Sequence, residues 1–320
     1  MPRFASAAEW VSPCVSSAAE ASGRAEPIGA AVAMVGKQTF FDQVVFSGGG
    51  TRCFWQAGFI HVLRQEIPVH PERLTGVSGG ACSACGFVTH RGERVRDAMI
   101  EAFSRQDWNI SLDDPASGDH GHTPHQRVYR EVIESCFGDR EAASLIDEGP
   151  QVQILIARPP SHSWAKLSGA AMTLVYEADT MLRSNPHLTW PEAAGMVGEL
   201  IDANQAARDG RITDLICAAA TIPPVFEPPL WGGAPAVDAG MIDQAPLPVP
   251  DQGRTLVLLT KIFRDVPEHP DRLYVMPSES VVADKIDFTD PDKLRQTWQQ
   301  GEEDAHAFLK SGGLTERLKP

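Results

Sequence analysis

Hydrophobic residues occur along this chain in two patterns, short continuous runs and longer stretches with helical spacing. The short runs predict buried strands at residues 44–46, 152–157, 255–259 and 272–276, and the end of another strand at 74–75. The longer stretches predict helices at residues 54–63, 81–88, 93–103, 126–137, 167–182, 191–207 and 291–309. Because predicted strands and helices alternate, we expect an α/β fold.

Three segments lie outside this pattern. Residues 1–40 are rich in Ala, Ser, Gly and Pro, which predicts a flexible N-terminal extension. Residues 107–125 are a predicted polar loop, and residues 311–320 a C-terminal tail, so the folded domain is expected at 41–310. The apolar run 28–36 is short and follows Glu26-Pro27. We therefore expect neither a signal peptide nor a transmembrane helix.

The first chemical motif, Ser47-Gly48-Gly49-Gly50-Thr51-Arg52, follows the strand at 44–46 and precedes a predicted helix. Such a turn leaves backbone N–H groups unpaired where the helix dipole also favours an anion. A Walker loop requires Gly-Lys-Ser/Thr at the end of the turn, and a dinucleotide fingerprint requires glycine at position 53, so neither fits Arg52-Cys53. An oxyanion hole for acyl transfer and an ordinary tight turn remain as interpretations.

The second motif, Gly76-Val77-Ser78-Gly79-Gly80, has the pattern Gly-x-Ser-x-Gly between a strand end and a small, apolar helix. This context predicts a nucleophile elbow, a sharp turn that holds the serine exposed at the bend. Gly76 and Gly80 supply the small residues that such a turn requires. Ser78 is therefore the candidate nucleophile.

The third motif is an aspartate at the end of a short apolar stretch, residues 234–237. Asp238 is followed by Ala239-Gly240, which favours a carboxylate at the rim of a sheet, where it could act as a base. Asp243 lies nearby as a competing candidate. The alternative for Asp238 is a turn residue that caps its own backbone.

The three motifs, in this order, resemble those of the patatin-like phospholipases, which are serine lipid acyl hydrolases. The family signature of Gly-Gly-Gly-x-Arg, Gly-x-Ser-x-Gly and Asp-Gly-Gly/Ala corresponds here to Gly48–Arg52, Gly76–Gly80 and Asp238–Gly240. A Pro-x-x-Phe-x-Pro segment at 223–228 is also similar, and the resemblance covers roughly residues 42–310. It implies a three-layer patatin-like fold with a mostly parallel central sheet flanked by helices.

The resemblance also implies a mechanism. Ser78 would attack a fatty-acyl ester and form an acyl-enzyme, and Asp238 would act as the base without a histidine. The implied oxyanion hole consists of Gly48, Gly49, Gly50, Thr51 and Arg52. No cofactor is implied, and the expected partners are a lipid or acyl-ester substrate and, transiently, a membrane surface.

Two departures from the family pattern keep other functions open. Cys53 and Ala239 stand where the family usually has glycine, which favours a catalytically silent lipid- or protein-binding module on the same fold. His269 and His306 follow Asp238 in the chain, so a Ser-Asp-His esterase is a second alternative.

Charge and cysteine content bear on which other functions and which cellular compartment fit the sequence. The formal net charge of -14 argues against nucleic-acid binding. Cys82 and Cys85 have a redox or metal spacing, but we expect them to be buried core residues of the helix after Ser78. The scattered cysteines indicate a reduced, cytoplasmic chain, with secretion as an effector without a cleaved signal as the alternative. Asp119, His120, His122 and His125 carry metal-binding groups, but their spacing fits no zinc pattern.

Overall fold

The structure, a computed structural model, describes residues 39–106, 124–159, 185–187, 196–223, 226–240 and 242–312. All of these belong to the compact unit Lys37–Pro320. The predictions for residues 1–38, for the polar loop up to residue 123, for the helix at 167–182 and for the tail from residue 313 lie outside the described residues.

The centre of the fold is a sheet of seven strands, with the order β4–β3–β2–β1–β8–β9 and with β7 also paired to β3. The parallel neighbours are β1 (Gln43–Phe46), β2 (Arg73–Val77), β3 (Gln151–Arg158), β8 (Thr255–Leu258) and β9 (Arg272–Val275). Two strands run antiparallel to β3, namely β4 (Val197–Asp202) and β7 (Val237–Asp238). A two-stranded sheet of β5 (Leu230–Trp231) and β6 (Ala234–Pro235) is separate. The predicted mostly parallel central sheet is confirmed.

Successive side chains of β1 enter different cores, as the pleat of a strand requires. Val44 and Phe46 belong to the large cluster that includes the helices, whereas Val45 packs with Val257 and Phe263 in a second cluster. Burial on both faces explains why the central strands appear in the sequence as continuous apolar runs.

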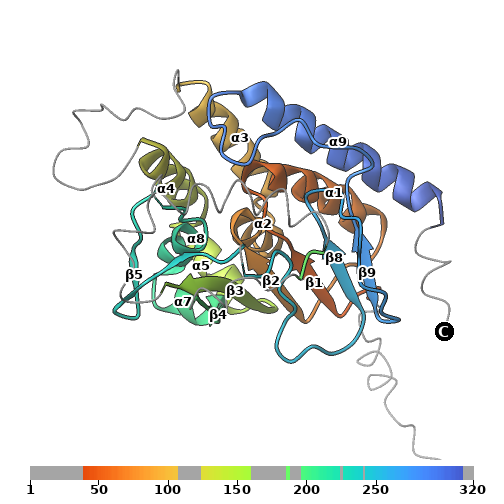
Figure 1. The fold of residues 1–320 in the computed structure, drawn as a ribbon, viewed down its shortest axis with the longest axis horizontal. Coiled ribbons are helices and arrows are strands. Elements are labelled where there is room, and N and C mark those ends of the chain that lie inside the picture. Colours follow the sequence, from red (N-terminus) through yellow and green to blue (C-terminus); the bar gives the residue numbers. More distant parts are fainter. Residues whose placement is uncertain are drawn as a thin grey trace, which may run out of the picture. The chain divides into compact units, whose positions relative to one another are not determined.

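Helices flank this sheet (Figure 1). They are α1 (Cys53–Glu66), α2 (Gly79–Val88), α3 (Gly92–Phe103), α4 (Pro124–Phe137), α5 (Arg140–Asp147), α7 (Ala203–Arg208), α8 (Ile212–Ala219) and α9 (Pro291–Lys310). The long helix α9 lies along α1, and α4 packs against α3 and α8. The predicted apolar face of α9 is confirmed, since Leu294, Trp298 and Ala305 are buried.

The predicted helix at 191–207 is wrong over its described part. Val197–Asp202 is strand β4, which pairs in antiparallel register with Gln153–Arg158 of β3. Pairing with β3 therefore outweighs the helical pattern that the sequence predicted for residues 191–207. Asp202 then ends the strand and caps α7, because its side chain accepts a hydrogen bond from the Gln205 N–H at 2.9 Å.

The register of β3 brings distant parts of the chain together. Val77, the last residue of β2, pairs with Leu155, and the next residue of β3, Ile156, pairs with Asp238 of β7. Because β4 occupies the other edge of β3 as far as Arg158, β7 continues the line of β2 beyond its carboxyl end. Asp238 is therefore positioned beside the residue that follows β2, which is Ser78.

Candidate active site

Ser78 occupies the turn between β2 and α2, with φ 56° and ψ -135°. Among the described residues, only Ser78 and His90 combine a side chain with positive φ, so the turn is strained. A Cβ on Gly80 would lie 2.3 Å from the Phe46 carbonyl oxygen, which is too close for any side chain. The sequence thus permits the sharp bend because small residues surround the serine.

The Ser78 hydroxyl donates a hydrogen bond to Asp238 Oδ2 at 2.5 Å. Both side chains are buried, with 3% and 6% of their residue surface exposed. The other carboxylate oxygen, Oδ1, accepts the Gly240 N–H at 2.7 Å, which fixes the orientation of the carboxylate. The structure therefore joins the candidate nucleophile directly to a candidate base.

Burial raises the pKa of the Asp238 carboxyl above its ordinary value. The positive charge of Lys285 and the hydrogen bonds from Ser78 and Gly240 lower it in part. A carboxylate with a raised pKa is a stronger proton acceptor than an ordinary aspartate, which is what abstraction of a serine proton requires.

The turn predicted to form the oxyanion hole meets Ser78 at Gly48, but the N–H groups of its five residues differ in availability. The N–H of Gly48 donates to Gln244 O at 2.8 Å, that of Thr51 to Lys285 O at 3.3 Å, and that of Arg52 to Gly49 O at 3.2 Å. Only the N–H groups of Gly49 and Gly50 have no acceptor within the described part of the chain. The loop therefore presents two donors rather than five.

A third donor comes from the residue after Ser78, a usual contributor at nucleophile elbows. The N–H of Gly79 has no protein acceptor in the described ranges, and a Cβ on Gly79 would lie 2.7 Å from Gly50 O. Gly79 and the glycine loop are thus in direct contact. Gly50 adopts φ +57°, and a Cβ there would lie 1.9 Å from Lys285 O, so the loop requires glycine at this position.

The two departures from the family pattern fit the structure. Ala239 is buried and does not have positive φ, so its methyl group causes no left-handed strain. Cys53 begins α1 with φ -64°, and its Sγ would lie 2.9 Å from a Cβ on Gly79, so it occupies space that a residue larger than glycine at 79 would need. Neither residue distorts the contact between Ser78 and Asp238.

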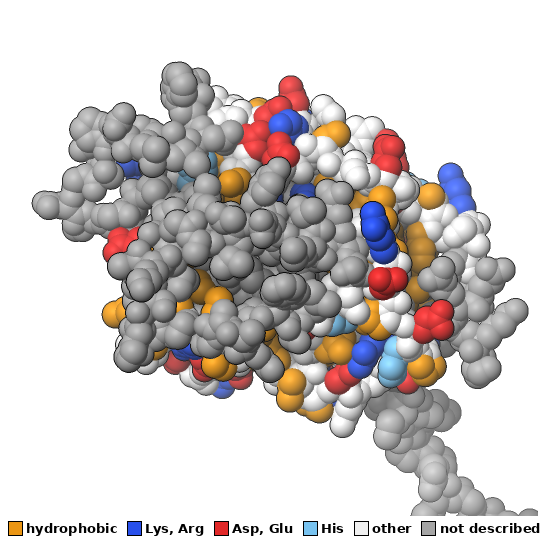
Figure 2. Space-filling model, in the orientation of Figure 1, with side chains coloured by type: hydrophobic (Ala, Val, Ile, Leu, Met, Phe, Trp, Pro, Cys, Tyr) orange, Lys and Arg blue, Asp and Glu red, His pale blue; other side chains and the backbone are white. Residues whose placement is uncertain are grey.

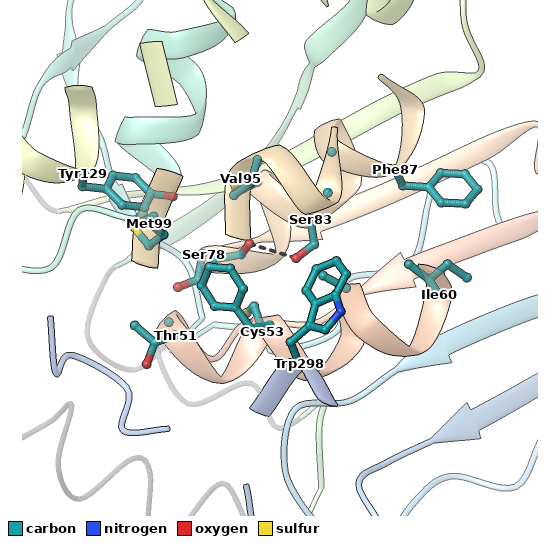
Figure 3. Close-up of a pocket in the computed structure, with 18 of the residues that line it drawn as sticks. Thr51, Cys53, Ile60, Ser78, Ser83, Phe87, Val95, Met99, Tyr129 and Trp298 are labelled. Carbon is teal, nitrogen blue, oxygen red and sulfur yellow. Dashed lines mark hydrogen bonds between the residues drawn. The ribbon is translucent and has the colours of Figure 1, made fainter. Parts of the chain in front are cut away.

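Ser78 opens into a cavity of about 100 Å³ (Figure 3). Its walls are mostly apolar and come from α1, α2, α3, α4, α9 and the segment 285–288. On α1, the lining residues Cys53, Ala57, Ile60 and Arg64 share one helical face. On α2, Gly79, Cys82, Gly86 and Phe87 do the same. An apolar group can therefore lie between the two helices with one end at the serine.

Other candidates from the sequence lie elsewhere. His269 and His306 are exposed and do not line the Ser78 cavity, and Asp243 bonds to His187 Nδ1 at 3.2 Å. Cys82 and Cys85 are free and buried, as expected. Asp119, His120 and His122 lie outside the described residues, and within the described ranges there is no group of metal-binding side chains.

Two residues of the site were not predicted from the sequence. Tyr129 lines the cavity from α4, where its neighbours Val128 and Val132 give it the pattern of an ordinary core residue. Lys285 lines it from an irregular segment that has no sequence motif. Neither position carries a signal that would have identified it from the sequence alone.

The distribution of charge on the surface and the hydropathy of the helices are relevant to contact with lipids. On the face shown in Figure 2, acidic and basic side chains of the described residues are interspersed, so the net charge of -14 does not form one acidic patch there. None of the helices in the described ranges has the length and hydropathy to cross a bilayer.

Comparison with known proteins identifies the family. No curated protein matches the sequence. Among solved structures, the crystal structure of VipD from Legionella pneumophila is similar, with 10% identity and a TM-score of 0.47 over 86% of this chain and 68% of that chain. The patatin-like phospholipase family matches residues 44–251, a range that includes the glycine loop, Ser78 and Asp238. Since this is more than half of the 320 residues, the chain belongs to the patatin-like phospholipase family.

Proposed function

We propose that this protein is a serine acyl hydrolase that cleaves fatty-acyl esters of lipids through an acyl-enzyme, with Ser78 as nucleophile and Asp238 as base. Family membership supports lipid acyl hydrolysis in general. The observation that carries the finer proposal is the 2.5 Å hydrogen bond to a buried carboxylate from the Oγ of Ser78, which lines an apolar cavity.

In the first half-reaction, Ser78 Oγ attacks the ester carbonyl carbon while its proton moves to Asp238 Oδ2. The carbonyl π electrons move to oxygen and give a tetrahedral oxyanion. When this collapses, the bond to the alcohol oxygen breaks, and Asp238 returns the proton to the leaving alcohol. The acyl group then remains on Ser78 as an ester.

In the second half-reaction, Asp238 takes a proton from water, whose oxygen attacks the acyl-enzyme carbonyl. Collapse of the second tetrahedral intermediate releases the fatty acid, and Asp238 returns the proton to Ser78 Oγ. The products are a free fatty acid and a lysolipid or glycerol derivative. Every proton transfer in this sequence uses groups of the chain, the substrate or water.

The oxyanion needs donors that are already oriented before it forms. The N–H groups of Gly49, Gly50 and Gly79 suit this role, because they have no acceptor in the described part of the chain and come from adjoining turns. In this proposal Gly48, Thr51 and Arg52 hold the loop in shape through their own hydrogen bonds.

The test is hydrolysis of a p-nitrophenyl acyl ester by the wild type and by Ser78→Ala. Loss of the nucleophile should lower turnover by about 10³-fold or more, with residual rate from the oxyanion donors. A fluorophosphonate probe should label the wild type and Ser83→Ala but not Ser78→Ala. Ser83 is the matched control because it is a second serine that lines the cavity.

Two results would contradict the proposal. If labelling disappears in Ser83→Ala and persists in Ser78→Ala, the nucleophile is Ser83 and not Ser78. A folded wild type that hydrolyses no acyl ester and takes up no probe would favour the silent binding module.

A further inference from the structure

The cavity extends to both sides of Ser78. We call the side lined by Ile60 of α1, Phe87 of α2 and Trp298 of α9 the first arm. The side lined by Met99 of α3 and Tyr129 of α4 is the second arm. In Figure 3, Tyr129 and Met99 lie on one side of Ser78, and Ile60, Phe87 and Trp298 lie on the other. An ester bound at Ser78 has two parts, the acyl chain and the alcohol, and two arms can separate them.

The second arm contains a polar group without a partner. The Tyr129 hydroxyl is buried and has no hydrogen-bond partner among the described residues, and Tyr129 as a whole is only 9% exposed. A buried hydroxyl without a partner destabilises the fold, so native proteins rarely retain one without a reason. Figure 3 shows that the ring points from α4 into the cavity on the side of Met99 and Ser78.

The phenol is suited to donate a hydrogen bond. Burial raises the pKa of Tyr129 well above its ordinary value, and the negative charge of Asp238 adds to the shift, so the hydroxyl keeps its proton. Its surroundings in the arm are apolar, with Phe103 and Phe288 stacked at 4.9 Å between ring centroids. The hydroxyl is therefore available to donate to an oxygen of a molecule bound in the cavity.

The chemistry of the substrate identifies that oxygen. The acyl chain carries no polar atom beyond the ester group, and the ester carbonyl is held by the backbone donors at Gly49, Gly50 and Gly79 in the proposed function. Within a bound ester, the acceptors that remain for Tyr129 are the oxygens of the alcohol part. In a glycerol ester, the carbon adjacent to the one that bears the cleaved ester carries a further oxygen, whereas in a simple alkyl ester it does not.

We propose that Tyr129 is a specificity-determining residue whose hydroxyl binds an oxygen of a glycerol-type leaving group, so that acylglycerols are preferred over acyl esters of simple alcohols. This inference rests on the proposed function of Ser78 and Asp238. It places the alcohol in the second arm and the acyl chain in the first arm.

The test compares two esters that share one acyl chain, monooctanoylglycerol and ethyl octanoate. In Tyr129→Phe, the ratio of kcat/KM for the glycerol ester to that for the ethyl ester should fall about tenfold, as for loss of one well-placed hydrogen bond. Because the hydroxyl has no partner in the described fold, the melting temperature should be equal or higher. A purely structural hydroxyl would instead lower it.

Tyr274→Phe is the matched control. Its hydroxyl bonds to His187 Nε2 at 2.8 Å and does not line the cavity, so this variant should lose stability and keep the wild-type ratio of the two esters. An unchanged ratio in Tyr129→Phe, or a lower melting temperature without a change in ratio, would overturn the inference. If the wild type hydrolyses ethyl octanoate in a Ser78-dependent way while the ratio stays constant, the proposed function stands and only the role of Tyr129 falls. If neither ester is hydrolysed, the proposed function fails.

Discussion

Two aspartates five positions apart in the chain, Asp238 and Asp243, take part in two very different polar clusters. Asp238 is buried and accepts the hydroxyl of Ser78, which lines the apolar cavity. Asp243 bonds to His187 Nδ1 at 3.2 Å, and His187 Nε2 lies 2.8 Å from the Tyr274 hydroxyl. By residue type, the second cluster is the one that looks like a catalytic triad.

The environments of the two clusters differ more than their compositions. The Asp243 side chain is 24% exposed, and its Oδ1 also accepts the Ala245 N–H at 2.9 Å. The backbone carbonyl of the adjoining Gln244 accepts the Gly48 N–H, and the Gln244 N–H donates to Pro186 O. This second cluster, which we call the brace, therefore has its polar groups paired and supports the glycine loop through Gln244. Asp238, in contrast, is buried at a cost that is visible in its raised pKa.

Under the proposed function, burial and strain, rather than residue type, separate the reactive cluster from the structural one. The comparison also makes a double prediction. Changes in the first cluster should remove activity without loss of stability, and changes in the second should lower stability while activity remains.

The largest effect is expected for Asp238→Asn. The amide keeps the shape of the side chain but cannot take the serine proton, so turnover of a p-nitrophenyl ester should fall about 10³-fold, close to Ser78→Ala. Because a buried charge is removed, the melting temperature at neutral pH should not fall. Asp243→Asn is the matched control and should keep turnover within about threefold, as for a residue that does not touch the reacting atoms.

The reverse outcome would break the comparison. Equal losses of turnover in Asp238→Asn and Asp243→Asn, or near-wild-type turnover in Asp238→Asn, would show that the base lies elsewhere.

The next largest effect is expected at Gly50. An alanine there would meet Lys285 O, so the loop must shift, and turnover should fall about 10²-fold as oxyanion donors lose alignment. Gly210 has a similar φ of +68° but open space around it. Gly210→Ala should therefore share the backbone strain, about 1 kcal/mol, without the loss of turnover. If the two variants have comparable turnover, the glycine loop does not contribute oxyanion donors to catalysis.

Much of this arrangement could be predicted from the sequence, because the relevant constraints are local. A Gly-x-Ser-x-Gly turn needs its small residues where the strand enters the helix, and the apolar runs of β1 and β8 reflect burial on both faces. These requirements predicted the elbow and the central strands. They could not assign Asp238 over Asp243, since both follow short apolar stretches.

The family resemblance favoured Asp238, and what brings Asp238 rather than Asp243 beside Ser78 is register, which is non-local. Ile156 pairs with Asp238 beyond the end of β2, and no local pattern encodes that pairing. The same limit applies to β4, whose strand conformation depends on the edge of β3, and to the glycine loop, where Gln244 and Lys285 take up N–H groups from outside the motif.

A smaller, graded effect is expected from pH. As pH falls through the raised pKa of Asp238, the base becomes protonated, so kcat/KM should fall tenfold per unit at a pH above the ordinary aspartate value of about 3.9. For stability the sign is opposite. A raised pKa contributes stability that is complete below the unfolded pKa and is lost as pH rises through the folded pKa. The melting temperature of Asp238→Asn relative to wild type should thus increase from pH 4 to 7, and a constant difference would contradict the burial argument.

The smallest effect on activity is expected in the brace. His187→Phe removes the hydrogen bonds to Asp243 and Tyr274 and leaves the Tyr274 hydroxyl without this partner, which should cost about 1–2 kcal/mol. For a domain of this size, that corresponds to about 2–4 °C in melting temperature. Turnover should stay within about threefold of wild type, because Gln244 still holds Gly48 through its backbone and the contact between Ser78 and Asp238 is untouched. Calorimetry and ester hydrolysis on the same preparation measure both quantities. If the variant keeps its melting temperature but loses as much turnover as Asp238→Asn, His187 takes part in catalysis, and the cluster of Asp243, His187 and Tyr274 is not merely structural.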